Sequence, residues 1–289
     1  MAVQIVVAGL TTGCIYALVA LGFTIVYNSA GIVNFAHGEF IMMGGVISAA
    51  LILKSGFPPI LALPASMMLV GCVAVLVDSL ILQRARRRSH ITLVMLTIGA
   101  GIVLRGAVEF TIGKDVYFPD GLGGISPVNV FGAHLAGQGV WIGLALITVS
   151  VGLWYLLNIT WLGRAMRATA ENPRAATLMG ISPRLISMVA FLMAGALGAM
   201  AGALIAPLAS ASYDIGLFFG IKGFAAAILG GLGNPIGAIV GGVLIGTIES
   251  LSAGYVASAY KDAIALALLI IMLLLRPSGI FGSPQLKRV

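Results

Sequence analysis

The sequence predicts an all-α fold, a polytopic membrane bundle of about eight to ten transmembrane helices that forms one domain over residues 1–289. Composition is the first reason, because 60% of the residues are hydrophobic and only 9% are charged, whereas a soluble domain carries about 25% charged residues. The second is the length of the uncharged stretches, such as 140–157 and 263–275, which approach the ~20 apolar residues that cross a bilayer core. The third is the abundance of Gly, at 39 copies, since small residues let membrane helices pack closely.

Nine apolar segments follow one another along the chain, and we expect a helix in each. They cover residues 4–27, 39–53, 60–82, 91–112, 139–158, 184–207, 218–233, 235–254 and 260–276. The second and the seventh are short and flanked by Gly, which makes them candidates for broken or half-spanning helices. Two long loops separate the segments: 113–139 is rich in Gly and Pro, and 159–183 is basic and helix-prone.

The distribution of Lys and Arg predicts the orientation in the membrane. If the N-terminus lies outside and all nine segments cross, eleven basic residues fall on the inner side: Arg84, Arg86, Arg87, Arg88, Arg164, Arg167, Arg174, Arg184, Arg276, Lys287 and Arg288. Four fall on the outer side, namely Lys54, Lys114, Lys222 and Lys261, and Arg105 lies within a span. Because cytoplasmic loops carry the excess of Lys and Arg, we expect an outer N-terminus, an inner C-terminus and a cytoplasmic 159–183 loop. The same placement explains the net charge of +7 without nucleic acid as a partner.

A weak internal repeat suggests that the bundle contains two inverted halves. A shift of 189 residues pairs nine identical residues between positions 9 and 44, among them Gly9 with Gly198 and Ala36 with Ala225. The charge-based topology makes the first segment run inward and the sixth run outward. The matching pieces are therefore expected to be inverted copies, a common plan in transporters.

The first polar motif occupies residues 31–40 and contains Asn34, Phe35, His37 and Glu39. A metal site is disfavoured because no third ligand lies nearby, and catalysis is disfavoured because no nucleophile is paired with the histidine. We favour a Gly-flanked helix break at the membrane boundary, where these polar groups satisfy freed backbone groups and Glu39 complements the dipole of the following helix. A gate or a lining of a solute path is the remaining interpretation.

The second polar motif occupies residues 163–181, in the basic loop. Asn172 followed by Pro173 is typical of a helix start and Gly180 suits a helix end, so we expect a short amphipathic helix over 173–179. Small residues leave room for another surface to approach, and arginines offer charge to an acidic partner. The candidate contact residues are Arg164, Arg167, Glu171, Arg174, Ala175, Ala176 and Gly180. A solvated basic loop that only sets the orientation is the alternative.

A third set of candidates comprises ionisable residues inside the predicted spans, namely Asp78, Arg105, Glu109 and Glu249. A charge at mid-membrane costs roughly 2.5–3.5 kcal/mol on insertion scales, so we expect each of them to have a partner. Arg105 and Glu109 are four residues apart and are expected to neutralise each other on one helix face. Asp78 is expected to approach the cluster at 84–88, and Glu249 has no evident partner. Clasps between helices are favoured over a substrate or proton site.

The sequence contains no Gly-x-x-x-x-Gly-Lys-Ser/Thr phosphate loop and no dinucleotide-binding glycine motif, and we expect no enzymatic activity, cofactor or metal of its own. Its motifs resemble those of the inner-membrane permeases of branched-chain amino acid ABC importers, of the LivH type, over nearly the whole chain. The similar stretches are 9–27, 34–39, 163–181 with its Ala-Ala-x-x-x-Gly core at 175–180, 223–231 and 276–280. Phe35 favours an amino acid as the solute, because related urea permeases more often carry Met there. The loop 82–89 departs from the family pattern, so a partner contact made by that loop is not carried over.

The resemblance implies a permease similar to those of type II ABC importers, placed in membrane lipid and paired with a second, similar permease. Two ATP-binding subunits are then expected to grip the 164–180 segment, while a periplasmic binding protein delivers leucine, isoleucine or valine. Three alternatives stay open. The same machine can carry urea, an amide, a sugar or another small solute; the chain can be an ion-coupled secondary transporter; or it can be a structural membrane subunit without a path.

Overall fold

The computed structural model describes residues 2–85, 89–130, 132–276 and 278–282. Its helices are α1 (Ala2–Ala30), α2 (His37–Leu53), α3 (Pro59–Val77), α4 (His90–Thr111), α5 (Gly137–Ile159), α6 (Trp161–Glu171), α7 (Pro173–Leu178), α8 (Pro183–Ala209), α9 (Ile215–Gly230), α10 (Pro235–Tyr255) and α11 (Lys261–Leu275). A π-helical turn, Asp78–Leu82, extends α3, and a short 3₁₀ turn, Ser258–Tyr260, precedes α11. Each predicted apolar segment is helical, which confirms the all-α prediction.

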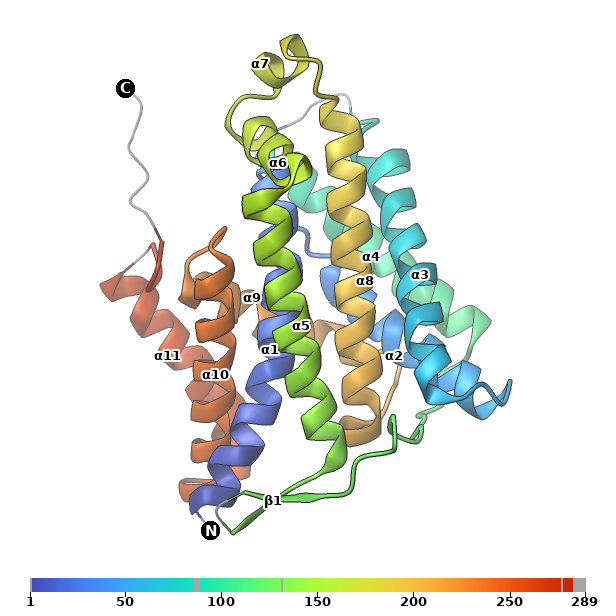
Figure 1. Ribbon diagram of the computed structural model, residues 1–289, viewed down its shortest axis with the longest axis vertical. Coiled ribbons are helices and arrows are strands. Elements are labelled where there is room, and N and C mark those ends of the chain that lie inside the picture. Colours follow the sequence, from blue (N-terminus) through green and yellow to red (C-terminus); the bar gives the residue numbers. More distant parts are fainter. Residues whose placement is uncertain (1, 86–88, 131, 277, 283–289) are drawn as a thin grey trace.

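Six of the described helices are long and apolar enough to cross a membrane: α1, α3 with its π-helical turn, α4, α5, α8 and α10. α2 and α9 are apolar but shorter, at 17 and 16 residues. A small hairpin, β1 (Val128–Val130) and β2 (Ala133–Leu135), lies in the long loop before α5. It is held near the N-terminus (Figure 1), where the Gln4 side chain exchanges hydrogen bonds with the His134 backbone.

The chain returns into the bundle before α2 begins. α1 ends at the end of the bundle that carries α6 and α7 (Figure 1), and residues 31–36 lead back toward the interior. α2 then starts beside the middle of α1, where His37 Nε2 lies 3.2 Å from the Val19 carbonyl oxygen. The break that we predicted at the membrane boundary therefore extends to the middle of the bundle.

α9 is the counterpart of α2 from the opposite end. α8 ends near the N-terminal end of the bundle, and residues 210–214 lead back, held by a bridge in which the Ala211 N–H donates to the Tyr117 carbonyl at 2.8 Å. The first turn of α9 meets that of α2, since a Cβ on Gly216 would lie 2.6 Å from the Gly38 carbonyl oxygen. The extended residues before each short helix thus cover the part of the bundle that the helix itself does not reach.

The bundle contains two similar halves, α1–α4 and α8–α11, whose corresponding helices run in opposite directions. α1 packs chiefly on α10 while α8 packs chiefly on α2 and α3, and the two short helices contact each other. The shift of 189 residues, however, is wrong in register. The starts of α2 and α9 differ by 215 − 37 = 178 residues, and those of α3 and α10 by 235 − 59 = 176. Gly and Ala recur at four-residue spacing in tightly packed helices, which produces identities at false registers as well.

Glycines bring the central helices into backbone contact, as the composition predicts. A Cβ on Gly44 of α2 would lie 2.1 Å from the Cα of Ala199 in α8, and one on Gly202 would lie 1.8 Å from the Ile41 carbonyl oxygen. Between α1 and α10, a Cβ on Gly242 would lie 2.3 Å from the Ala17 nitrogen. These contacts exclude even an alanine without separation of the helices, so they fix how the two halves meet.

Candidate translocation path and coupling segment

Polar side chains satisfy the backbone at the break between α1 and α2. The Asn34 side-chain oxygen accepts a hydrogen bond from the Ala36 N–H at 3.1 Å, and the Phe35 N–H donates to the Thr97 hydroxyl of α4 at 3.2 Å. The Asn34 carbonyl accepts from the His37 N–H. Because side chains replace water as hydrogen-bond partners, the helix break can lie at mid-depth instead of at the boundary.

His37 is fully buried against α1. Its ring packs edge-on to Phe23 with centroids 4.7 Å apart, and a Cβ on Gly22 would lie 2.3 Å from the ring. Among the described residues, the Asn34 Nδ2 and His37 Nδ1 atoms are buried without a hydrogen-bond partner. In the part of the chain that the structure describes, no three His, Cys, Asp or Glu side chains lie close enough to hold a metal ion.

Glu39 pairs with Arg105, which corrects the predicted pair of Arg105 and Glu109. Arg105 Nη2 lies 2.5 Å from Glu39 Oε1, and its Nε lies 3.4 Å from Oε2. Glu109 pairs instead with Lys114 beyond the end of α4, at 2.8 Å, and that hydrogen bond raises the pKa of Lys114. The four-residue spacing was misleading because Arg105 belongs to the face of α4 that contacts α2, whereas Glu109 points toward the helix end.

Glu249 of α10 belongs to a buried network that the sequence did not predict. Lys222 Nζ lies 2.7 Å from Glu249 Oε1 and 2.6 Å from Asp262 Oδ1, and the Tyr16 hydroxyl donates to Glu249 Oε2 at 2.7 Å. Lys261 lies at 4.0 Å from Glu249. The network links α1, α9, α10 and α11.

Lys222 lies inside α9 and its side chain is only 5% exposed, so its assignment to the outer side is wrong. The signal that would have found it is its position within the apolar segment 218–233, where a cation requires a carboxylate partner. Asp262 was missed because the first turn of a helix tolerates a carboxylate without any partner.

Asp78 lies beside a cleft of about 280 Å³ at the α6–α7 end of the bundle. The Ser187 hydroxyl donates to Asp78 Oδ1 at 2.8 Å, and the Gln83 amide donates to Oδ2 at 2.6 Å. The predicted cluster at 84–88 falls largely on residues 86–88, which lie outside the described residues. Thr169 and Pro173 also line the cleft, so it borders part of the α6–α7 segment.

The basic loop folds into two short helices that project from one end of the bundle (Figure 1). The Asn172 side chain caps α7 by accepting from the Arg174 and Ala175 N–H groups at 3.1 Å, and Gly180 has a positive φ of 79°. Ala176 is buried and Ala175 is exposed, so only Ala175 leaves room for another surface, contrary to our expectation for both. Arg164, Arg167, Glu171 and Arg174 lie on the same two helices.

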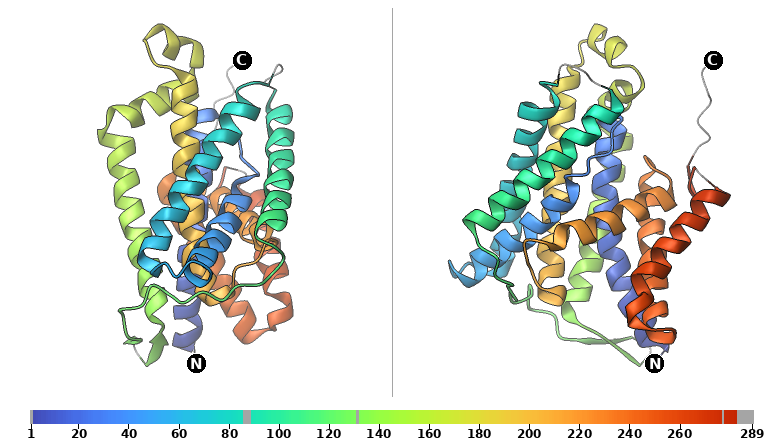
Figure 2. Two further views of the ribbon diagram at one scale, coloured as in Figure 1. Left: turned by 90° about the vertical axis from the view of Figure 1, so that its right-hand side faces the viewer. Right: turned by 180° about the vertical axis from the view of Figure 1, so that it is seen from behind.

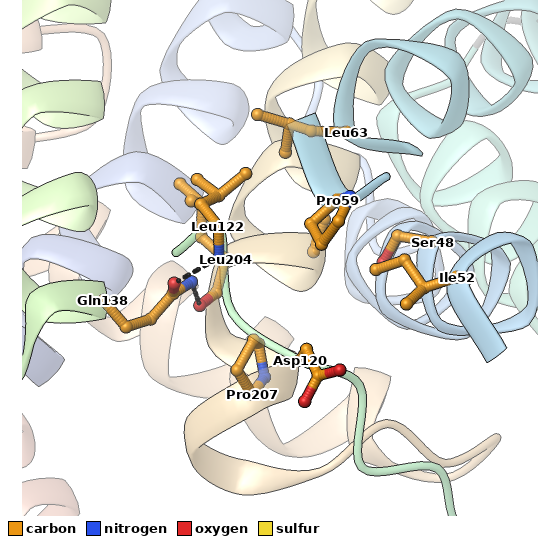
Figure 3. Close-up of a pocket in the computed structure, with 10 residues that line it drawn as sticks. Ser48, Ile52, Pro59, Leu63, Asp120, Leu122, Gln138, Leu204 and Pro207 are labelled. Carbon is orange, nitrogen blue, oxygen red and sulfur yellow. Dashed lines mark hydrogen bonds between the residues drawn. The ribbon is translucent and has the colours of Figure 1, made fainter. Parts of the chain in front are cut away.

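A small pocket lies at the opposite end of the bundle (Figure 3). The Gln138 amide donates to the Leu204 carbonyl at 2.7 Å and its oxygen accepts from the Leu122 N–H at 3.2 Å. Ser48, Asp120 and Pro207 line the same small pocket, which holds only about 10 Å³. A cavity of that size has room for about one water molecule. The pocket is therefore too small for a solute.

One face of the bundle shows the two short helices between α4 and α11 (Figure 2, right). Arg105 of α4, which pairs with Glu39 at the start of α2, is 30% exposed, and Phe35 is also exposed, with its ring centroid 5.2 Å from that of Phe224 in α9. A partly exposed guanidinium at mid-depth is costly against lipid. This face, which we call the α4–α11 face, therefore suits water or another protein better than lipid.

Inverted halves, short helices that meet at mid-depth and a charged face within an apolar bundle define a multi-pass membrane protein of the transporter type. The chain belongs to the family described as branched-chain amino acid transport system / permease component, which matches residues 5–273. Related proteins are the high-affinity branched-chain amino acid transport system permease protein LivH of Escherichia coli (strain K12), 32% identical over 97% of this chain and 96% of that protein, and BraD of Pseudomonas aeruginosa, 33% identical over 99% and 97%.

More distant similarity extends to a sugar permease and a solved structure. The ribose import permease protein RbsC of Haemophilus influenzae is 27% identical over 90% of this chain and 80% of that protein. A chain of PsaBC from Streptococcus pneumoniae, solved in complex with Fab, aligns with a TM-score of 0.52 and 14% identity over 95% of this chain and 92% of that chain, which supports the fold alone. The family consists of membrane permeases and is not a family of enzymes. Membership in this family of ABC importer permeases implies ATPase and solute-binding partners.

Proposed function

We propose that the chain is the permease subunit of an ABC importer that moves leucine, isoleucine or valine across the inner membrane. Similarity over nearly the full length to permeases named for branched-chain amino acids carries the proposal. In it, residues 1–289 act as one transmembrane domain that pairs with a second, similar permease, two ATP-binding subunits and a periplasmic solute-binding protein.

The proposed orientation has a periplasmic N-terminus and a cytoplasmic C-terminus. The N-terminus and the α6–α7 segment lie at opposite ends of the bundle (Figure 1), and the latter carries Arg164, Arg167 and Arg174. Lys54 and Lys114 follow helices that end toward the N-terminal side. The excess of basic residues supports a cytoplasmic α6–α7 segment.

The α6–α7 segment, within 159–183, is the proposed contact with the ATPase. Its tip exposes Leu178 at 89% and Met179 at 82%, so it offers an apolar anchor. Arginines and Glu171 on α6 and α7 surround this anchor with charge, and Gly180 lets the chain turn back sharply. Closure of the ATP-binding subunits then pushes this segment toward the cleft beside Asp78 and biases the bundle between two states.

The solute path is proposed to follow the α4–α11 face, with Asn34, Phe35, His37 and Glu39 at its narrowest level. The helix break at mid-depth supports this placement, because transporters commonly bind their solutes at that depth. The second permease covers the remainder of the face, which removes Arg105 from contact with lipid.

Uptake of labelled leucine, ribose and urea by proteoliposomes with all components tests the proposal. We expect ATP-dependent leucine uptake that stops when the ATP-binding subunits are omitted. Leucine accumulation without them would show an ion-coupled transporter, and uptake of ribose or urea alone would assign another solute.

Cysteine labelling tests the orientation. In a variant without Cys14 and Cys72, a membrane-impermeant maleimide should label Phe57→Cys from the periplasmic side and Leu178→Cys only after the membrane is opened. Labelling of Leu178→Cys in intact cells would overturn the coupling role of α6 and α7.

A further inference from the structure

The guanidinium of Arg105 is only partly used by its partner. Two of its N–H groups face the two oxygens of Glu39, in a side-on arrangement. A guanidinium has five N–H donors. In the described part of the chain, no further acceptor contacts it, and the side chain is 30% exposed while Glu39 is 8% exposed. Arg105 therefore has free donors on its exposed side, whereas the charge of Glu39 is almost fully enclosed.

The charges at this level do not cancel. Glu39 lies in the first turn of α2, and a Cβ on Gly216, in the first turn of α9, would lie 3.1 Å from Glu39 Oε2. Each helix N-terminus is equivalent to roughly +0.5 charge. Two helix starts and Arg105 thus contribute about +2 against the −1 of Glu39, which leaves about one positive charge. An additional anion is favoured at this point.

A second polar group, just before the start of α2, lacks a partner. Asn34 is 1% exposed, and its Nδ2 donates to no described group although its oxygen is bonded to the first turn of α2. An aromatic side chain lies close by, because the Phe35 N–H donates a hydrogen bond to Thr97 of α4, the helix that also carries Arg105. Thr97 and Arg105 are eight residues apart, or about 12 Å along the helix.

We propose that Arg105 binds the carboxylate of the transported solute as it passes the meeting point of α2 and α9. This inference rests on the proposed function and deepens it, since it names a carboxylate as the recognised group. Glu39 holds the guanidinium in place and the two helix starts add positive potential. A neutral solute such as urea or ribose gains nothing from this arrangement, whereas an amino acid presents its carboxylate to the charge and its apolar side chain to Phe35.

Uptake kinetics of the complete importer give the first test. Arg105→Gln should lower the maximal rate of leucine uptake about tenfold or more, because a hydrogen bond to a charged group is lost. The leucine concentration at half-maximal rate should stay unchanged, since the binding protein captures the solute first. Arg105→Lys should retain part of the rate, and Lys114→Gln, a control outside the path, should retain all of it.

A paired substitution separates binding from a structural role. Replacement of a buried ion pair by apolar residues is often neutral for stability. Glu39→Met with Arg105→Met should therefore keep the thermal stability of the complex while leucine uptake stays low. Uptake at the wild-type rate by this double variant would show that the ion pair only holds α2 and α4 together, and it would overturn the inference.

Chemical protection tests the wild-type complex without any substitution. Phenylglyoxal modification of Arg105, followed by mass spectrometry, should be slowed by leucine and not by leucinol, which keeps the amine and the side chain but lacks the carboxylate. Equal effects of the two would refute carboxylate binding. A wild-type importer that takes up no leucine would overturn the proposed function and this inference together, whereas normal uptake by Arg105→Gln would overturn the inference alone.

Discussion

Lys222→Met tests whether the buried network holds α9 in place. Lys222 is 5% exposed, and its ammonium contacts Glu249, Asp262 and, at 3.9 Å from the centroid, the Phe218 ring. Methionine keeps much of the length and apolar contact of the lysine stem but removes the charge. The substitution therefore isolates the electrostatic part of the interaction.

The expected loss of stability in Lys222→Met depends on how well each of the two remaining carboxylates is solvated without its cation. Asp262 is 42% exposed and can be hydrated, whereas Glu249 is 8% exposed. Breaking a buried pair by removing one partner costs about 3–5 kcal/mol. Because the Tyr16 hydroxyl and the more distant Lys261 still support Glu249, we expect the lower end, about 3 kcal/mol, or a thermal midpoint about 6–12 °C lower.

Thermal unfolding of the purified permease in detergent, run as a double-mutant cycle, measures this loss. Adding Glu249→Leu to Lys222→Met should recover most of the stability, because the buried uncompensated carboxylate is then gone. A melting temperature of Lys222→Met equal to that of the wild type, or effects of the two substitutions that simply add, would refute the reasoning.

Three further substitutions probe the packing and the coupling segment. Gly44→Ala should reduce the folded yield strongly, as measured by size-exclusion chromatography, because the new Cβ would lie 2.1 Å from the Ala199 backbone. Gly22→Ala should cost about 1–3 kcal/mol through its collision with the His37 ring, and a second substitution, His37→Ala, should restore part of the melting temperature. Leu178→Glu should leave the melting temperature unchanged, since the side chain is 89% exposed, and should lower ATP-driven uptake at least about fivefold if it removes an anchor worth about 1 kcal/mol or more.

Glycine controls for the packing argument exist on α4 and α5. A Cβ on Gly143 or on Gly99 would meet nothing within 4 Å, so alanine at either site should change stability by less than about 0.5 kcal/mol. An equal loss at Gly143 and Gly44 would contradict the packing argument. Melting of Leu178→Glu below the wild type would show that the tip of α7 supports the fold and does not serve only a partner.

Local signals in the sequence were sufficient for the helices and for some of their ends. Asn172 and Pro173 predicted the start of α7, and the structure shows the side-chain cap that this pair of residues favours. Apolar length predicted the spans because a bilayer imposes it. The shortness of two segments also indicated half-spanning helices, although their meeting point inside the bundle was not foreseen.

The choice of partners could not be predicted because it depends on contacts between distant segments. Arg105 has Glu109 one turn away but bonds with Glu39, 66 residues distant, since α4 packs with that face on the start of α2. Glu249 and Lys222 are 27 residues apart on antiparallel neighbours, a relation that no helical spacing reports. The periodicity of a sequence shows which residues share a helix face, but it does not show which neighbouring helix packs on that face.

The two halves of the bundle share one plan but have diverged in their charges. Each short helix is tied by an ion pair to the last helix of its own half: α2 to α4 through Glu39 and Arg105, and α9 to α11 through Lys222 and Asp262. In the first half the cation is partly exposed, whereas in the second it is buried between two carboxylates. We therefore expect the first pair to meet the solute and the second to hold helices together.

This division of roles predicts unequal effects of neutralising the exposed member of each pair. Asp262→Asn leaves Lys222 with Glu249 and removes a carboxylate that is 42% exposed, so it should change the free energy of unfolding by less than about 1 kcal/mol and leave uptake nearly intact. Arg105→Gln removes the cation that pairs with Glu39 and should stop most uptake. Measured side by side in the same proteoliposomes, equal losses from both substitutions would show that the two pairs act alike, and that the positive charge on the α4–α11 face has no special part in transport.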